Sequence, residues 1–217
     1  MRTLFPTAVP GMRGERMVAL LPGTYIAPED FVREGFPETL VSRGMAAELA
    51  LAEMRAAWFA DGSIVERIRE HVVAPARARG HRRIWLGGIS LGALASLAYA
   101  ARHGHELEGL VLLSPYPATR EILREVEAAG GARPWSAQAP PGDDLERQAW
   151  HWLATRTGGT PRVRCYFGSS DRFAAGQRLM ARTLGPGEAH ELRGAHDWAT
   201  WRESWARFVD ELRGSSA

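Results

Sequence analysis

The stretch from residue 83 to residue 94 constrains the fold of this chain more than any other. Its short apolar run ends at a pair of glycines, Ser90 follows, and an alanine- and leucine-rich segment begins after Gly92. This order predicts a strand, a sharp turn and a helix, and residues 88–92 match the pattern G-x-S-x-G. Small residues on both sides of the serine let strand and helix pass close together. We therefore expect a strained turn that presents the Ser90 hydroxyl at the carboxyl edge of a sheet.

The pattern alone leaves two interpretations of this turn open. One is a structural turn with an ordinary serine, which is common in α/β proteins. The other is a nucleophilic Ser90, because backbone N–H groups at a helix N-terminus point at developing negative charge. The second interpretation needs a base, an orienting acid and an oxyanion site elsewhere in the chain.

The rest of the chain alternates between strand and helix patterns. Continuous apolar runs are typical of buried parallel strands, and the alternation predicts a mostly parallel sheet of about six strands with helices on both faces. The run 47–52 fits a strand or a helix, and its place between two helices favours a strand. The expected strands are 17–21, 47–52, 84–88, 110–113, 163–167 and 189–192, and the expected helices are 28–44, 64–78, 91–103, a segment from the turn after 171 to 184, and 198–213.

The length of 217 residues suits a single α/β domain spanning 1–217. The segment 118–160 departs from the alternation, with helical patterns at 121–129 and 144–155 separated by glycines and prolines. It is too long for a plain connection between strand and helix. We interpret it as a small helical cap inserted over one edge of the sheet.

Composition excludes several classes of function. The net charge is +2 and no basic block is interleaved with aromatic residues, which argues against a nucleic-acid partner. Lysine is absent, so no Schiff base and no lysine-dependent phosphate loop can form. Cys165 is the only cysteine, so no disulfide forms within the chain. No apolar run approaches the roughly 18 residues of a membrane span, and no apolar leader is present, so we expect a cytoplasmic protein.

Three polar residues follow three different expected strands, in the order Ser90, Asp171, His196. A serine hydroxyl is a poor nucleophile unless a neutral imidazole takes its proton. The imidazolium that forms needs a carboxylate on its other nitrogen, which fixes the tautomer and stabilises the charge. The sequence therefore predicts a triad of Ser90 as nucleophile, His196 as base and Asp171 as orienting acid.

From residue 17 to residue 213 the chain resembles a small α/β-hydrolase. The resemblance is carried by the turn 88–92, by the turn 168–171 that ends in the acid, and by the histidine loop 194–198. The last of these, continued to Trp201, is similar to the ending of an esterase group that includes relatives of feruloyl esterase and enterochelin esterase. The resemblance implies an α/β-hydrolase fold and a serine hydrolase.

The resemblance also implies an oxyanion hole. One donor would be the backbone N–H of Leu91, directly after the nucleophile, and the second would come from the loop after the first strand. The family pattern assigns the second donor to Thr24, with Tyr25 as the fallback. Pro22 and Gly23 stand where the family often has a His-Gly pair. This departure from the family pattern lies in the loop that would supply the second donor.

Several residues compete for these roles or extend the site. Asp197, next to the histidine, is expected to cap the last helix, and Glu121 follows the strand at which some hydrolases carry the acid. Cys165 lies within a strand pattern and is expected to be a small buried apolar residue. Tryptophans of the cap fit either its core or an acyl- or aryl-binding wall. We expect the residues in contact with substrate to be Tyr25, Tyr116, Trp150 and Trp198.

The function predicted from the sequence is hydrolysis of a carboxylic ester through an acyl-enzyme intermediate. An acyl-thioesterase with the same triad is the alternative, and a catalytically silent protein that binds a small ligand is a third possibility from a different class. No cofactor and no metal are expected, and no feature specifies an oligomeric state. A long apolar tunnel beside Ser90 would indicate acyl chains, and a short aromatic cup would indicate small or aryl esters.

Overall fold

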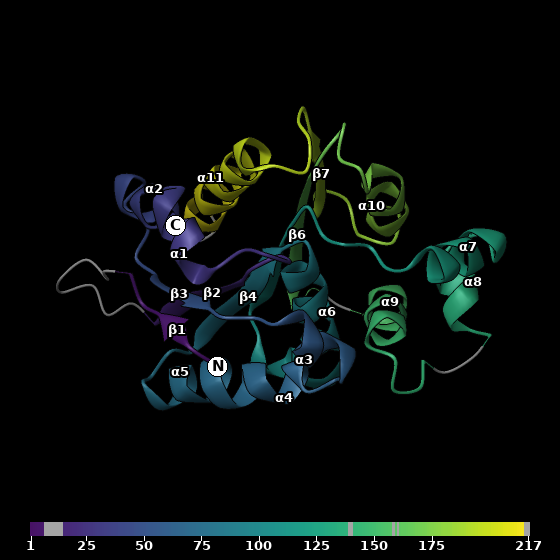
Figure 1. Cartoon of the computed structure of the whole chain (residues 1–217), viewed down its shortest axis with the longest axis horizontal. Coiled ribbons are helices and arrows are strands. Elements are labelled where there is room, and N and C mark those ends of the chain that lie inside the picture. Colours follow the sequence, from purple (N-terminus) through teal and green to yellow (C-terminus); the bar gives the residue numbers. More distant parts are fainter. Residues whose placement is uncertain (7–14, 139–140, 158, 160, 215–217) are drawn as a thin grey trace.

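A seven-stranded sheet forms the centre of the molecule (Figure 1). The computed structural model describes residues 1–6, 15–138, 141–157, 159 and 161–214. The strand order is β1-β3-β2-β4-β5-β6-β7, and all pairs are parallel except the pair of β1 with β3. The strands are β1 (Thr3–Leu4), β2 (Arg16–Leu21), β3 (Glu48–Ala52), β4 (Arg83–Ile89), β5 (Gly109–Leu113), β6 (Arg162–Gly168) and β7 (Ala189–Leu192).

The six strands expected from the apolar runs are all present, and the structure adds β1 at the edge. Two residues of β1 pair with Leu51 and Ala52 of β3 in the antiparallel direction. Such a short strand has no periodicity to detect, which is why the sequence did not predict it. The sheet is therefore one strand larger than expected.

The helices differ from the expected ones in several places. The short helices Ala56–Ala60 and Ala132–Ser136 were not expected, and the expected helix 64–78 contains a π-helical turn. The expected helix 28–44 is two helices, because Gly35 has a φ of 78° and breaks it. The helix after Asp171 ends at residue 181 rather than 184. The helices are α1 (Pro28–Arg33), α2 (Phe36–Ser42), α3 (Ala56–Ala60), α4 (Ile64–Ile68), a π-helical turn (Arg69–Val73), α5 (Ala74–Ala78), α6 (Leu91–His103), a 3-10 turn (Gly104–Glu106), α7 (Arg120–Ala128), α8 (Ala132–Ser136), α9 (Leu145–Thr155), α10 (Ala174–Ala181) and α11 (Trp198–Gly214).

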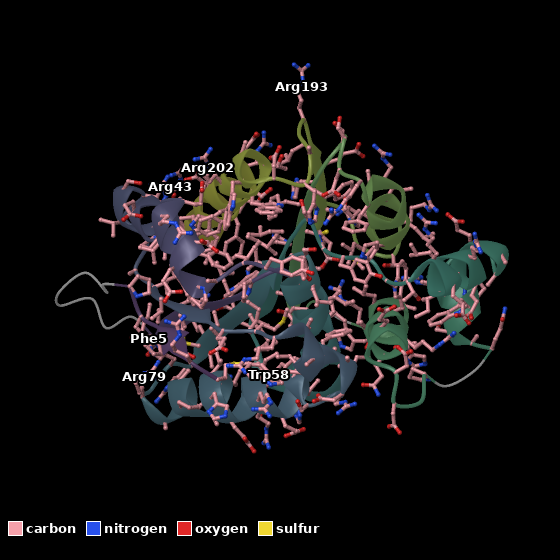
Figure 2. The ribbon with its side chains drawn as sticks, in the orientation of Figure 1. Phe5, Arg43, Trp58, Arg79, Arg193 and Arg202 are labelled. Carbon is pink, nitrogen blue, oxygen red and sulfur yellow. The ribbon has the colours of Figure 1, made fainter. Side chains whose placement is uncertain are left out.

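Helices cover both faces of the sheet, and each face has its own apolar core. On one face α1, α2 and α11 pack on alternate residues of the strands, with Trp205 and Phe208 of α11 fully buried. On the other face α4, α5 and α6 lie over the remaining residues. Figure 2 shows side chains filling both spaces, whereas Arg193 projects outward from the loop after β7. Within the described ranges no helix is both long and apolar enough to cross a bilayer.

The segment 118–160, which was expected to form a small helical cap over one edge of the sheet, contains α7, α8 and α9 among its described residues. Helices α7, α8 and α9 lie together at one side of the molecule, with α9 beside α6 (Figure 1). Apolar residues of α9, among them Trp150, join the core of the α6 face. The segment extends the helical layer that contains α6, because the apolar residues of α9 are buried against α6. Positions 139, 140, 158 and 160 lie outside the described residues.

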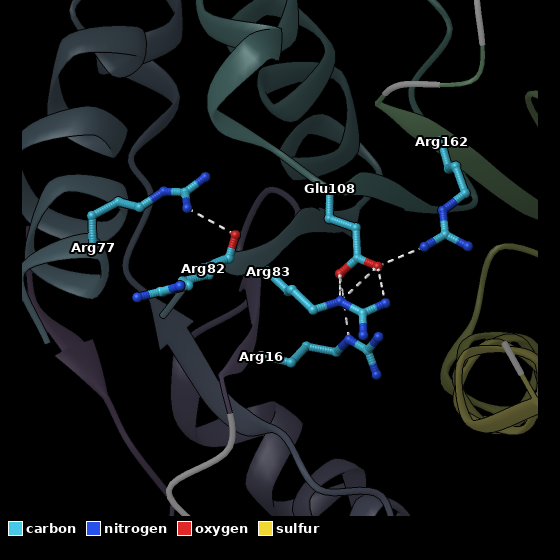
Figure 3. A network of polar contacts seen from close by, with 6 residues as sticks. All are labelled: Arg16, Arg77, Arg82, Arg83, Glu108 and Arg162. Carbon is cyan, nitrogen blue, oxygen red and sulfur yellow. Dashed lines mark hydrogen bonds and ion pairs between the residues drawn. The ribbon is translucent and has the colours of Figure 1, made fainter. Parts of the chain in front are cut away.

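At the amino edge of the sheet, three arginines converge on the carboxylate of Glu108 (Figure 3). They come from the first residues of three strands: Arg16 of β2, Arg83 of β4 and Arg162 of β6. Arg16 is only 5% exposed, so its charge is largely removed from water. Burial raises the pKa of Glu108, but hydrogen bonds from Arg83 and Arg16 outweigh this effect and the pKa is lowered. The shared carboxylate thus joins the starts of neighbouring strands.

Replacing this carboxylate should destabilise the fold. We expect Glu108→Ala to lower the free energy of unfolding at pH 7 by about 3 kcal/mol, because three guanidinium groups lose their common partner. Because the folded pKa of Glu108 is depressed, its ionised form stabilises the fold above the unfolded pKa near 4.5. This stability is lost as the pH falls through the folded value, so the free energies of unfolding of wild type and variant should converge at pH values below it.

Urea unfolding at several pH values measures the difference. Glu203→Ala is the matched control, because Glu203 pairs with Arg207 on the exposed face of α11. Such a pair contributes about 0.5 kcal/mol or less. Equal effects of the two substitutions would show that the Glu108 cluster does not stabilise the sheet.

Candidate active site

Ser90 occupies a sharp turn between β4 and α6, as the G-x-S-x-G pattern predicts. Its backbone has φ 53° and ψ −115°, a conformation that a serine rarely adopts. A Cβ on Gly88 would lie 2.1 Å from the carbonyl oxygen of Leu21, and one on Gly92 would lie 2.3 Å from the same oxygen. Only glycine fits at both positions, because the turn crosses directly over the end of β2.

Asp171 follows β6 in a tight turn and its side chain is fully buried. Its Oδ1 accepts a hydrogen bond from the backbone N–H of Phe173 at 2.8 Å. Its Oδ2 lies 2.7 Å from Nδ1 of His196 and 3.2 Å from Nε2 of Gln177. Burial raises the pKa of Asp171, but the hydrogen bonds from His196 and Phe173 outweigh it and the pKa is lowered. The carboxylate is therefore ionised at neutral pH.

His196 lies in the loop between β7 and α11. Because the ionised carboxylate of Asp171 can only accept, Nδ1 of His196 carries the proton and Nε2 is free to accept another. The imidazole ring lies between two aromatic rings, Phe173 and Trp201, each with its centroid 5.2 Å away and nearly perpendicular. These edge contacts and the hydrogen bond to Asp171 hold the ring in one orientation.

Ser90 and His196 line the same cavity, which has a volume of about 590 Å³. Among the described residues the Ser90 hydroxyl makes no hydrogen bond to His196. Hydrogen bonds of this type are often long before substrate binds and tighten in the complex. The other residues of the wall are mostly apolar or aromatic: Gly23, Thr24, Ile26, Leu91, Tyr116, Arg172, Phe173, Asp197, Trp198 and Trp201.

The loop after β2 also lines the cavity. Ile26 N–H donates to the carbonyl of Gly23, closing a four-residue turn in which Tyr25 has a φ of 65°. Thr24 and Leu91 both line the cavity, as expected for two oxyanion donors. The side chain of Tyr25 is fully exposed and does not belong to the cavity wall. Of the two alternatives for the second donor, Thr24 is a lining residue of the cavity and Tyr25 is not, and the assignment of the backbone N–H donor stays a prediction.

The four residues expected to contact substrate separate into two groups. Tyr116 and Trp198 line the cavity, whereas Tyr25 and Trp150 do not. Trp150 is completely buried beside α6, where its indole N–H donates to the carbonyl of Pro117. It belongs to the core and not to a binding wall, because α9 packs against α6. Its expected role in substrate binding is wrong.

Several residues of the site were not expected from the sequence. Trp201 packs in the core, as expected, but it also lines the cavity, which was not expected. Arg172 and Phe173 directly follow the acid, and the guanidinium stacks over the ring at 4.8 Å. Gln177 is buried beside Asp171. The only sequence signal for Gln177 is a polar residue within the apolar pattern of its helix.

The competing residues lie outside the cavity or have other roles. Glu121 lines a different cavity, formed with α9. Asp197 accepts hydrogen bonds from the backbone N–H and the hydroxyl of Thr200, which confirms it as the cap of α11. Cys165 is buried in β6, as expected. Among the described residues no three His, Cys, Asp or Glu side chains gather closely enough to hold a metal ion.

Comparisons with known proteins identify the fold. No protein-family model and no curated protein sequence matches the chain. Solved structures do match it. They include a fluorophosphonate-binding serine hydrolase of Staphylococcus aureus (13% identity, 90% of this chain, 82% of that chain, TM-score 0.66). Est1E from Butyrivibrio proteoclasticus is another (17% identity, 92% of this chain, 87% of that chain, TM-score 0.62). A third is a monoacylglycerol lipase from Paleococcus ferrophilus (16% identity, 100% of this chain, 100% of that chain, TM-score 0.58).

The agreement of strand order, helical layers and these structures establishes the architecture. The chain has the α/β-hydrolase fold, with helices on both faces of a mostly parallel sheet. At identities below 20% the likeness concerns the fold, so the chemistry must be argued from the residues in the cavity.

The burial of Cys165 can be tested by alkylation of its thiol. Burial raises the pKa of its thiol to about 12, so almost no thiolate is present at pH 8. We expect iodoacetamide to leave the native protein unmodified and to alkylate it once in urea, as measured by intact-protein mass spectrometry. Alkylation of the native protein at the rate of the unfolded chain would contradict the burial of this thiol.

Proposed function

We propose that the protein is a serine hydrolase that cleaves a carboxylic ester. The observation that carries the proposal is the 2.7 Å hydrogen bond between buried Asp171 and His196, at a cavity that also exposes Ser90. The names of the structural neighbours, which include a serine hydrolase and a lipase, support the same class of reaction. The strained backbone of Ser90 supports its role as the nucleophile.

In the proposed reaction Ser90 Oγ attacks the ester carbonyl while Nε2 of His196 takes its proton. The negative charge on the carbonyl oxygen would be held by the backbone N–H groups of Leu91 and Thr24. Collapse of this intermediate expels the alcohol, which receives the proton from His196, and leaves an acyl group on Ser90. Water, deprotonated by His196, then releases the acid. Asp171 remains ionised throughout and stabilises the imidazolium.

The shape of the cavity favours a small or aryl ester. A wall formed by Tyr116, Phe173, Trp198 and Trp201 suits a flat or compact acyl group. The volume of about 590 Å³ lies in the range of sites for small molecules. The same triad could act on a thioester, so an acyl-thioester is included among the test substrates.

A fluorophosphonate probe tests the nucleophile. We expect it to label the wild-type protein at Ser90, because only an activated serine hydroxyl reacts with it at neutral pH. Ser90→Ala should abolish labelling, whereas Ser96→Ala should leave it unchanged, because Ser96 lies on the same helix with its hydroxyl bonded to the carbonyl of Gly92. Peptide mass spectrometry locates the label. Labelling that survives Ser90→Ala would reject this serine.

Substrate preference tests the proposed role of the aromatic wall. Across p-nitrophenyl and phenyl esters, kcat/KM should be highest for acetate, butyrate and aryl acids, and about tenfold or more lower for palmitate, whose long flexible chain is not the flat or compact acyl group that this wall suits. Trp198→Ala should reduce the ratio between kcat/KM for the short or aryl esters and kcat/KM for palmitate. A preference for long acyl chains, or for acyl-thioesters over matched esters, would contradict the substrate class proposed here.

A further inference from the structure

Gln177 is a buried polar side chain next to the proposed acid. It lies on α10, two turns after Asp171, and none of its surface is exposed. Its Nε2 lies 3.1 Å from the carbonyl oxygen of Pro115 and 3.2 Å from Oδ2 of Asp171. Pro115 belongs to the loop after β5, so one amide group contacts two different loops at the carboxyl edge of the sheet.

The chemistry of the neighbours fixes the orientation of the Gln177 amide. A backbone carbonyl and an ionised carboxylate can only accept hydrogen bonds, so the NH₂ group must face both. The oxygen Oε1 then points the other way and has no partner among the described residues, although it is fully buried. A buried carbonyl oxygen without a donor destabilises a fold. A leucine or methionine would avoid this cost, which suggests that the amide has a use other than stability.

The contact with Pro115 extends to the nucleophile. The next residue, Tyr116, donates its backbone N–H to the carbonyl of Ser90 at 3.0 Å. A chain of hydrogen bonds therefore runs from Asp171 through Gln177 to the loop after β5 and on to the turn that carries Ser90. Tyr116 also lines the cavity, so this loop forms part of the binding wall.

We propose that Gln177 is a positioning residue of the triad, an inference that rests on the proposed function. Its NH₂ group holds Asp171 with Oδ2 toward His196, while the N–H of Phe173 holds Oδ1. Without the amide, one oxygen of the carboxylate loses its second donor and the side chain gains rotational freedom. Gln177 also fixes the distance between the loop that carries the acid and the loop that contacts Ser90.

Kinetics test the positioning role. Gln177→Met keeps an unbranched side chain of similar length but removes both hydrogen bonds. We expect kcat for a p-nitrophenyl ester to fall about 10- to 100-fold while KM stays within about twofold, because the loss affects the transition state and not substrate binding. Gln148→Met, a substitution on α9 away from the cavity, is the control and should change neither constant. A kcat of Gln177→Met within twofold of wild type would overturn the proposal.

The unusual composition of the chain allows a direct spectroscopic test. Asparagine is absent and only three glutamines occur, Gln138, Gln148 and Gln177, so a ¹⁵N-labelled sample has three side-chain NH₂ pairs. Loss of one pair in Gln177→Met assigns it, and Gln138→Met with Gln148→Met assigns it by elimination should Gln177→Met not fold. We expect the Gln177 pair to exchange slowly with solvent and to shift in Asp171→Ala, with the other two pairs unmoved.

A fluorophosphonate adduct on Ser90 gives the functional arm of this test. The adduct mimics the tetrahedral state and should shift the Gln177 pair, because protonation of His196 places a positive charge next to the Asp171 carboxylate that Gln177 contacts. The inference would be overturned by a Gln177 pair that exchanges with solvent as fast as the other two. It would also be overturned if the chemical shifts of this pair change neither in Asp171→Ala nor in the adduct. If wild-type protein neither hydrolyses esters nor takes the probe, the proposed function fails, and the response to Asp171→Ala still decides whether Gln177 holds this carboxylate.

Discussion

The close crossing of the turn at Ser90 over the end of β2 is the constraint on which the site depends. The carbonyl oxygen of Leu21 lies where a Cβ on Gly88 or Gly92 would be. Any larger residue would push α6 away from the sheet and rotate the serine out of the cavity. Gly87 has a similar role toward the neighbouring strand, where a Cβ would lie 1.9 Å from the carbonyl of Val111. The position of the hydroxyl is thus a consequence of backbone packing in the middle of the sheet.

The two edges of the sheet use charged residues for different purposes. At the amino edge Glu108 is shared by arginines from three strands, and this cluster connects the strands where they begin. At the carboxyl edge the carboxylate of Asp171 is shared by a histidine, an amide and a backbone N–H, and it adjoins the cavity. Arginine keeps its charge at all relevant pH values, whereas histidine can exchange a proton near neutrality. Of these two carboxylates, only Asp171 is therefore paired with a group that can exchange a proton near neutral pH.

Most of the fold could be predicted from the sequence because its signals are local. Buried parallel strands appear as continuous apolar runs, and the glycines around Ser90 mark a turn that few other residues allow. The placement of Trp150 could not be predicted, because the same indole suits a core or a binding wall, and only the packing of α9 on α6 decides. The role of Gln177 was not predicted for a related reason: its hydrogen-bond partners, Asp171 and Pro115, lie 6 and 62 positions away in the sequence.

Backbone strain is concentrated on the side of the molecule that carries the cavity. Among the described residues, four that are not glycine have positive φ angles: Tyr25, Ser90, Ser114 and Ala118. The first three follow β2, β4 and β5 within a few residues of the carboxyl ends. Each such conformation costs about 1–3 kcal/mol, and the unpartnered oxygen of Gln177 adds a further cost nearby. The two apolar cores offset these costs, and their rigidity lets strained loops keep the hydroxyl and the imidazole on one cavity, with the buried carboxylate bonded to the imidazole, before any substrate binds.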